Sequence, residues 1–277
     1  MKILNNPLID LQQFEFKKLN GLSHSTFFYW AIKNNYFDVF VKLLRKKLDP
    51  SIHNNLPIIM ACEYGHIDMV NELLKDYRVN PAAQSDRAIL EASRYGHLSV
   101  VKKLLLDIRV DPSSLNNYAI KEACRFGRAE IVNFLLADPR IDAFDNNSEA
   151  LCWASQNGHL NCVKELLSSS LITAISTIDS LIWAFTNERY DIIKYLLEDG
   201  RVDPSEEDNF CIQQASRKGY VEIVRILLED HRVDPTANEN YALIWSIRLN
   251  YDDITELLIS DIRLKNYNIS GLMQHYN

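Results

Sequence analysis

Three histidines of this chain share one local setting, because His66, His97 and His159 each directly follow a glycine. Imidazole nitrogens are common metal ligands, and three of them converging on one point would form a metal site. These histidines, however, lie 31 and 62 residues apart. Equivalent copies in a stack of packed helices would be separated by about 10 Å. We therefore predict a structural role for them and no metal site.

The cysteines point to neither a disulfide framework nor a zinc site. They are odd in number, no two have C-x-x-C spacing, and they comprise Cys62, Cys124, Cys152, Cys162 and Cys211. Free cysteines usually behave as small core residues, and reduced thiols are typical of the cytosol. We therefore predict reduced, buried thiols and a cytoplasmic protein.

Known catalytic signatures are missing from the sequence. It contains no G-x-x-x-x-G-K-[ST], no G-x-G-x-x-G, no H-E-x-x-H and no G-x-S-x-G. No acid–base pair stands outside the repeated pattern described below. We predict a protein that is not an enzyme and that needs no cofactor.

Arginine and aromatic residues recur at two positions just before the glycine. The first position holds Lys33, Glu63, Arg94, Arg125, Gln156, Thr186, Arg217 and Arg248. The second holds Asn34, Tyr64, Tyr95, Phe126, Asn157, Asn187, Lys218 and Leu249. Arginine and aromatic side chains are enriched at the centres of protein interfaces. We predict a partner-binding set that consists of Tyr64, Arg94, Tyr95, Arg125, Phe126, Arg217, Lys218 and Arg248.

A second interpretation of these residues stays open. Glu91–Arg94 and Glu122–Arg125 have the spacing of ordinary helical ion pairs. Trp245–Arg248 and Trp30–Lys33 have the spacing of cation–π pairs that cover a solvated helix face. Such pairs need no partner protein.

A repeat of 30 or 31 residues runs through the chain and must position these side chains. A small residue anchors each copy, at Ala31, Ala61, Ala92, Ala123, Ala154, Ala184, Ala215 and Ser246. A leucine pair follows 11 or 12 residues after each anchor, from Leu43-Leu44 to Leu257-Leu258. Eight matches at nearly constant offset predict eight structural units rather than one or two compact domains.

Each unit is predicted to hold two short helices, as the fourth one illustrates. Ala119, Ile120, Ala123 and Cys124 form one apolar stripe at helical spacing, and Gly127 is a typical helix stop. Two further apolar pairs at 131–132 and 135–136 give the second helix. Before the first helix we predict an N-cap, at Ser25, Asn55, Asp86, Asn117, Ser148, Asn209 and Asn240 in the successive units, with Ile178 as the exception.

One such unit buries too little apolar surface to fold alone, so neighbouring units must stack into a solenoid. The predicted repeats are 25–54, 55–85, 86–116, 117–147, 148–177, 178–208, 209–239 and 240–263. We predict that 1–24 caps the first repeat and that 264–277 closes the last. The fifth unit departs from the pattern at 168–170, 178 and 187–188, which leaves drift and a change of curvature as alternatives.

The repeat resembles the ankyrin repeat. The likeness lies in A-x-x-x-G-H-x-x-[VI]-V-x-x-L-L, as in Ala92–Leu105 (ASRYGHLSVVKKLL) and Ala61–Leu74 (ACEYGHIDMVNELL), and in the R-V-D-P turn at Arg109–Pro112. The resemblance implies an all-α helical-repeat solenoid with a concave groove lined by the two positions before the glycine. The family's T-P-L-H segment is absent, with only Pro57 retained, so its Thr–His hydrogen bonds should be missing. Similar divergent arrays occur in large DNA viruses and amoebae, which would place the protein in a host cytoplasm and suggest a host–virus interaction.

Two functions compete at this point. The first is a monomeric, non-catalytic scaffold that binds an unidentified protein through the groove and the loop tips. The second is a binder of a polyanion, such as nucleic acid or an acidic head group, through Arg94, Arg125, Arg217 and Arg248. The net charge of −7 argues against a protein that coats nucleic acid or anionic membrane with its whole surface. No segment is apolar and long enough to span a membrane, and Met1–Asp10 lacks the core of a signal peptide.

Overall fold

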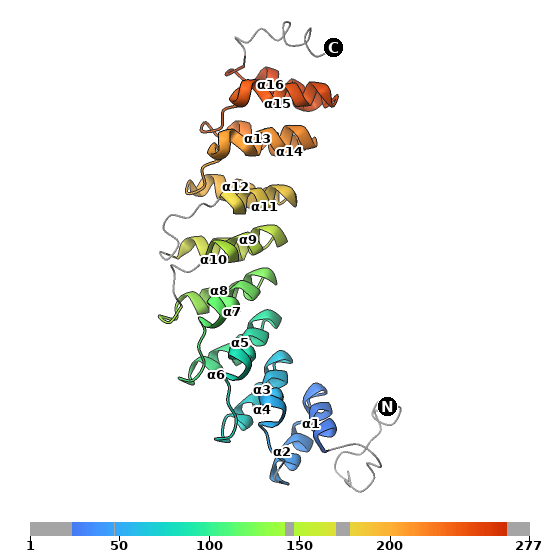
Figure 1. Cartoon of the computed structure of the whole chain (residues 1–277), viewed down its shortest axis with the longest axis vertical. Helices are drawn as coiled ribbons and strands as arrows, with labels where there is room; N and C mark the ends of the chain where they lie inside the picture. Colours follow the sequence, from blue (N-terminus) through green and yellow to red (C-terminus); the bar gives the residue numbers. More distant parts are fainter. Residues whose placement is uncertain (1–23, 47, 142–146, 170–177, 265–277) are drawn as a thin grey trace. The chain divides into compact units, whose positions relative to one another are not determined.

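The computed structural model describes residues 24–46, 48–141, 147–169 and 178–264. Within these residues it contains α-helices and no β-strand, which confirms the predicted all-α class (Figure 1). The helices are α1 (His24–Lys33), α2 (Phe37–Arg45), α3 (Ile52–Glu63), α4 (Ile67–Leu73), α5 (Ala83–Tyr95), α6 (Leu98–Leu105), α7 (Ser114–Arg125), α8 (Ala129–Leu136), α9 (Asn147–Asn157), α10 (Leu160–Ser168), α11 (Ile178–Thr186), α12 (Tyr190–Asp199), α13 (Glu206–Lys218), α14 (Val221–Glu229), α15 (Ala237–Arg248) and α16 (Asp252–Ser260). The predicted terminal caps at 1–24 and 264–277 fall almost wholly outside the described residues and stay predictions.

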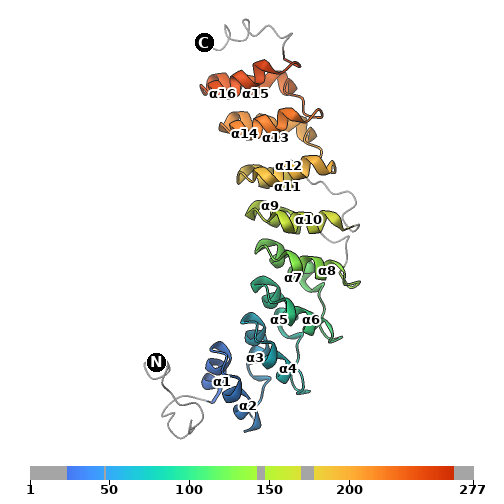
Figure 2. The same cartoon turned by 180° about the vertical axis from the view of Figure 1, so that it is seen from behind.

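The helices come in antiparallel pairs, and we call the first helix of each pair the inner helix and the second the outer helix. The chain divides into two compact units, unit 1 (Met1–Ala119) and unit 2 (Ile120–Asn277). In unit 1, inner helices α1, α3 and α5 contact one another in sequence, and so do outer helices α2, α4 and α6. Unit 2 repeats this arrangement with inner helices α9 to α15 and outer helices α8 to α16 (Figure 2).

The hydrophobic core of both unit 1 and unit 2 consists of the residues that define the repeat. Every anchor, from Ala31 to Ser246, is completely buried. In seven leucine pairs the first leucine is buried, and in the eighth it is the second, Leu258. A small anchor allows close approach of the paired helices, and the leucine fills the space between successive pairs. This packing is the physical origin of the period.

The inner helices begin differently from our prediction. Three consecutive non-glycine residues with φ between 48° and 65° precede the first regular turn of α3, α5, α7, α13 and α15. The last of the three is the predicted cap, and it is always Asn or Asp, the residues that best tolerate this left-handed conformation. In three of the five repeats its side chain bonds to the next repeat rather than to its own helix. The Oδ1 atoms of Asn55, Asp86 and Asn209 accept hydrogen bonds from the backbone N–H groups of Asn80, Asp111 and Asp234, at 2.7, 2.9 and 2.6 Å.

The backbone N–H groups of Asn80, Asp111 and Asp234 each lie at the start of a tight turn. Asp111 Oδ1 accepts hydrogen bonds from the backbone N and the Oγ of Ser113, at 2.9 and 2.7 Å. The same Asp–Pro–Ser/Thr geometry recurs at Asp49, Asp203 and Asp234. An aspartate that binds the backbone two residues later fixes the chain direction at this point.

The glycine–histidine pair also joins neighbouring repeats. Gly65 has φ 73°, and a Cβ atom added to it would lie 2.4 Å from the His97 ring of the next repeat. His97 Nε2 lies 2.9 Å from the Glu63 carbonyl oxygen, at the end of the preceding inner helix. His159 repeats this contact with the Arg125 carbonyl at 3.1 Å, and Arg189 does so with the Gln156 carbonyl at 3.2 Å. These contacts confirm the structural role predicted for His97 and His159.

An arginine follows six of the eight outer helices, and Arg232 shows how it forms a third link between repeats. Arg232 donates through Nη2 to Asp230 Oδ2 at 2.6 Å and to the Leu197 carbonyl at 3.0 Å, and through Nη1 to the Val202 carbonyl at 2.8 Å. The hydrogen bonds from Arg232 hold the pKa of Asp230 below its usual value. Arg232 and Asp230 therefore form a local ion pair, and the carbonyl groups that Arg232 caps belong to the preceding repeat. Arg263 and Arg109 make equivalent bonds to the carbonyls of Val233 and Val79.

Gly65→Ala should destabilise the array through backbone strain and through a clash with His97. Gly200→Ala should cause the backbone strain alone, so a comparison of the two variants separates the effects. Both glycines have a positive φ, but a Cβ at Gly200 would meet nothing within 4 Å. We expect Gly200→Ala to lower the free energy of unfolding by about 1 kcal/mol through backbone strain alone. Gly65→Ala also displaces His97 from its carbonyl partner, so we expect a loss of about 2–4 kcal/mol. Urea unfolding of both variants measures the difference, and equal losses would show that His97 does not depend on the glycine.

Asp86→Asn should stabilise the protein at neutral pH. Asp86 is buried where other repeats have Asn, and burial raises the pKa of its carboxyl group. A raised pKa in the folded state means that wild-type stability falls as the pH rises through that value. Asparagine keeps the acceptor for Asp111 without burying a charge, so its urea midpoint should exceed that of wild type at pH 7.

The gain should disappear in acid, where Asp86 itself is protonated. The reverse change in unit 2, Asn209→Asp, serves as the matched control and should lower the urea midpoint at pH 7. An Asp86→Asn protein that is less stable than wild type at pH 7 would contradict this account.

Candidate protein-binding face

In unit 1 the predicted aromatic side chains lie at the C-terminal ends of the inner helices. Tyr64 directly follows α3, and Tyr95 is the last residue of α5. The Tyr95 ring is 45% exposed and stacks on His97 with 6.5 Å between centroids, while Tyr64 stacks on His66 at 6.0 Å. His97, which stacks with the Tyr95 ring, is itself bonded to the end of α3.

Arg94 belongs to a charged cluster around a buried glutamate. Glu91 accepts from Arg94 Nη1 at 3.0 Å and from Arg87 Nε at 3.1 Å, and its side chain is almost fully buried. The pair Glu91–Arg94 suggested by the sequence is therefore formed. Burial, reinforced by the charge of Glu91, raises the pKa of nearby Glu63. The arginines thus have a local structural partner, and Arg94 still reaches the surface.

In unit 2 the corresponding arginine lies on a tryptophan. The Arg125 guanidinium is 4.8 Å from the centroid of the Trp153 ring and 5.6 Å from that of Phe126. Its ion pair with Glu122 is longer, at 3.5 Å. Phe126 is 42% exposed. The structure therefore brings Arg125 and Phe126 together with Trp153, a residue that we did not predict at the site.

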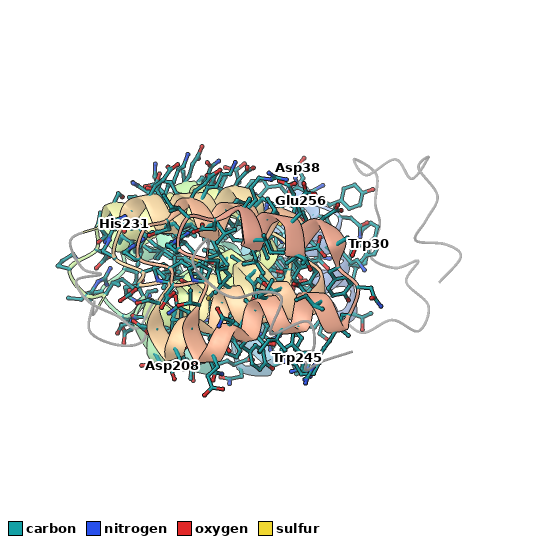
Figure 3. All side chains as sticks on the ribbon, turned by 90° about the horizontal axis from the view of Figure 1, so that it is seen from above. Trp30, Asp38, Asp208, His231, Trp245 and Glu256 are labelled. Carbon is teal, nitrogen blue, oxygen red and sulfur yellow. The ribbon has the colours of Figure 1, made fainter. Side chains whose placement is uncertain are left out.

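Further along unit 2, Arg217 and Arg248 share one ring. Their guanidinium carbons lie 5.0 and 5.4 Å from the centroid of Trp245. Figure 3 shows Trp245 and Glu256 on opposite sides of the α15–α16 pair, so this cluster belongs to the inner-helix side. Lys218 lies 5.6 Å from the ring of Phe185 in the preceding inner helix. Guanidinium groups stacked on aromatic faces keep their N–H edges available for carboxylates.

All four tryptophans occupy the same repeat position, directly before the anchor. They are Trp30, Trp153, Trp183 and Trp245. None of them is buried, although tryptophan is a large apolar residue. Sequence reasoning named Trp30 and Trp245 only as covers for neighbouring charges. Aligning the tryptophans on the 31-residue period would have revealed the row.

A buried lysine lies beside this row. Lys121 is almost inaccessible and contacts Glu149 Oε2 through Nζ at 2.6 Å. This hydrogen bond holds the pKa of Glu149 below its usual value. Glu149 is also 3.5 Å from the indole Nε1 of Trp153. The ion pair therefore fixes Trp153, on which Arg125 stacks, and the sequence pattern gave no sign of it.

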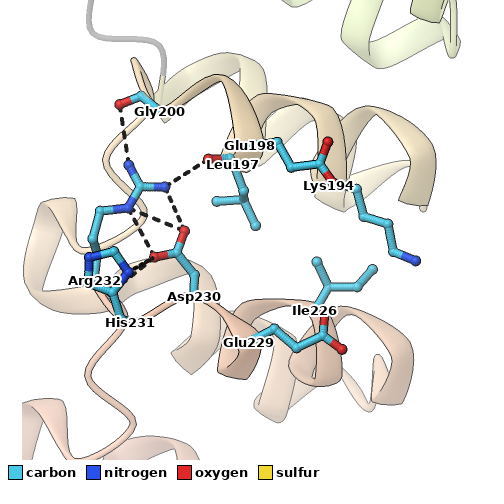
Figure 4. A pocket seen from close by; sticks show the side chains of 9 residues that line it. All are labelled: Lys194, Leu197, Glu198, Gly200, Ile226, Glu229, Asp230, His231 and Arg232. Carbon is cyan, nitrogen blue, oxygen red and sulfur yellow. Dashed lines mark hydrogen bonds and ion pairs between the residues drawn. The ribbon is translucent and has the colours of Figure 1, made fainter.

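A cavity of about 570 Å³ lies between outer helices α12 and α14 of unit 2 (Figure 4). Leu197 and Ile226 form its apolar wall, and Lys194, Glu198 and Glu229 lie at its rim. Asp230 and Arg232 at the other end are already bonded to each other and to the preceding repeat. The residues that line the cavity include no Ser, Thr or Cys. Among the described residues, no group of three or more His, Cys, Asp or Glu side chains is arranged to hold a metal ion.

Comparison with known proteins agrees with this architecture. The family model for ankyrin repeats, in three copies, matches residues 28–116, 89–177, 120–208 and 181–268. Among solved structures, the crystal structure of the human ASB11 ankyrin repeat domain is similar, with a TM-score of 0.51 and 20% sequence identity over 69% of this chain and 97% of that one. Among curated proteins, none matches the sequence. Because the matched ranges span most of its length, the chain belongs to the ankyrin repeat family.

Proposed function

We propose that the chain is a non-catalytic scaffold, acting as a monomer in the cytoplasm, that binds a partner protein through the inner-helix face and the loop tips. Ankyrin repeats are generally protein–protein interaction modules, which supports the general assignment. The observation that carries the choice of face is the row of solvent-reaching Arg–Trp stacks at Trp153 and Trp245. Five free cysteines, four of them buried, fit a reducing compartment.

The inner-helix face offers a partner preorganised contacts. Trp153 is fixed by Glu149, and Tyr95 is fixed by His97. Because these side chains are already ordered, binding costs less conformational entropy than it would on mobile side chains. Large aromatic and arginine residues dominate binding energy at protein interfaces. A partner with acidic and apolar side chains would satisfy both parts of this surface.

The double variant Tyr95→Ala, Phe126→Ala should weaken partner binding at least about ten-fold without unfolding the array, since both side chains are about half exposed. Cross-linking capture followed by quantitative mass spectrometry identifies the partner, and calorimetry then gives the Kd. The matched control is Tyr195→Ala on outer helix α12, where the ring stands 5.5 Å from Lys164 Nζ. Wild-type affinity in the double variant, with native circular dichroism, would refute the choice of face.

A polyanion remains the second candidate, because arginines on aromatic platforms also suit single-stranded nucleic acid. Arg125, Arg217 and Arg248 would form its ladder in unit 2. The same calorimetry with single-stranded DNA decides between the two. A polyanion complex must weaken steeply as salt rises, whereas a protein complex held by aromatic contacts should respond weakly.

A further inference from the structure

The net negative charge of the chain comes from unit 2. Residues 1–119 contain 15 Lys and Arg against 12 Asp and Glu, whereas residues 120–277 contain 15 against 25. The net charge of −7 therefore describes neither half of the chain. Unit 1 is weakly basic as a whole, so its charge is compatible with binding to an anionic surface. The net negative charge of unit 2 would instead be repelled by such a surface.

The positive charge of unit 1 gathers where the outer helices end. We call residues 41–46, 71–78 and 102–109 the basic edge; they close α2, α4 and α6 and run into the following loops. The basic edge contains eight Lys and Arg against three Asp and Glu. Arg109 of the third segment donates to the carbonyl oxygen of Val79, directly after the second segment, at 3.0 Å. Arg78 Nη1 lies 3.8 Å from Asp49, in the loop that follows the first segment. The loops are thus held side by side, and Figure 1 shows those after α4 and α6 leaving unit 1 on the same side.

Large apolar side chains project from the same edge. Tyr77, Leu106 and Ile108 are 92%, 81% and 94% exposed, the highest values among the large apolar residues that the structure describes. Tyr77 and Ile108 stand at the middle position of the Asp-x-Arg turn, whose flanking residues bond to each other. The turn therefore holds its middle side chain outward. Tyr77, Leu106 and Ile108 are thus exposed apolar side chains within segments of the chain that are rich in lysine and arginine.

Unit 2 provides an internal comparison, because the repeat places equivalent residues in its own loops. The equivalent segments, 133–140, 164–169, 194–201, 225–232 and 256–263, contain seven Lys and Arg against eight Asp and Glu. Their middle turn residues include Pro139, Gly200 and His231, and only Ile262 is apolar and large. The combination of basic charge and apolar tips is therefore specific to unit 1 and does not follow from the repeat.

We propose that the basic edge docks unit 1 on the surface of a bilayer that contains anionic lipid. Lysines and arginines at the ends of α2, α4 and α6 lie at the level of the head groups, and Tyr77, Leu106 and Ile108 enter the interface between head groups and acyl chains. Each basic residue near an anionic leaflet contributes favourable binding free energy. Each methylene group that enters the membrane interface makes a further favourable contribution. No described helix is long and apolar enough to cross a membrane, so the attachment is peripheral.

A bilayer fits this edge better than an acidic protein does. The three tips protrude almost completely into solvent, whereas interface anchors usually lie within a packed patch that excludes water around them. A fluid lipid surface adapts to isolated protrusions without needing complementary pockets. Tyrosine is enriched at membrane interfaces, and lysine can bury its stem while the ammonium stays among the head groups.

Vesicle co-sedimentation of the full chain tests the proposal. The protein should bind vesicles of phosphatidylcholine mixed with phosphatidylserine, and should not bind phosphatidylcholine alone. The variant Tyr77→Ser, Leu106→Ser, Ile108→Ser should lower the partition coefficient at least about ten-fold, because it removes the inserted apolar groups. Lys42→Gln, Lys75→Gln, Lys103→Gln should lower it by a similar factor. Raising the salt from 0.1 to 1 M shortens the Debye length from about 10 to about 3 Å and should also weaken binding.

Unit 2 supplies the matched controls. Ile262→Ser removes an exposed apolar side chain from the same position of the Asp-x-Arg turn. The triple variant Lys164→Gln, Lys194→Gln, Arg225→Gln removes the same amount of charge from the outer helices of unit 2. Both control proteins should bind vesicles as wild type does.

Failure of the wild-type protein to bind the phosphatidylserine vesicles overturns the proposal. Binding that survives in the triple serine variant with native circular dichroism overturns it as well. Binding of a poly-glutamate peptide at the basic edge, with vesicles ignored, would assign the edge to an acidic protein instead. The Tyr95→Ala, Phe126→Ala protein should keep its vesicle binding, so this test stands apart from that of the proposed function.

Discussion

A helix pair of about 31 residues buries too little apolar surface to fold alone, and the whole chain depends on what each pair gains from its neighbours. Leucines at the pair interfaces supply the apolar part of that gain. Three polar links direct it: the Asn or Asp oxygen to the next backbone N–H, the His or Arg after the glycine to the preceding helix end, and the Asp-x-Arg guanidinium to the preceding carbonyls. Hydrogen bonds to buried backbone groups are specific in geometry, so they fix the register of one pair on the next.

These links also explain why the repeat tolerates unusual backbone. Three left-handed residues in a row are unfavourable for L-amino acids, yet they recur in five inner helices. At Asn55, Asp86 and Asn209 the turn aims the side chain at the following repeat, and the hydrogen bond that the side chain accepts offsets part of the strain. The glycine before the histidine is needed for two reasons at once, its positive φ and the ring lying against its Cα. The first, sixth and eighth repeats lack that glycine, and there Asn35, Glu188 and Asn250 adopt the same left-handed conformation.

Periodicity made the fold predictable from the sequence, because anchors and leucines are buried in every copy and so recur in every copy. The helix pairs, the glycine stops and the Asp–Arg pairs were all visible in one unit. The partners of polar side chains were not, since they lie in the next repeat and need three-dimensional packing to be seen. The side chain of Asn55 was therefore predicted to cap its own helix, whereas it accepts a hydrogen bond from the backbone N–H of Asn80. The buried Lys121–Glu149 pair and the Arg125–Trp153 stack were missed for the same reason. The shared repeat position of the four tryptophans is visible in the sequence, but the prediction used only the two positions before the glycine.

An array of this kind separates its surfaces by repeat position rather than by domain. The inner-helix face uses the residues around the anchor, and the basic edge uses residues ten to seventeen positions later, so one can change without the other. Each repeat contributes one side chain to each row, which spaces the contacts by about 10 Å along the stack. Charge can then differ between repeats at the same repeat position, as the basic edge of unit 1 and the nearly neutral equivalent loops of unit 2 demonstrate. A chain without enzymatic motifs can therefore hold two independent binding surfaces, because the links that build the stack leave both rows free to vary.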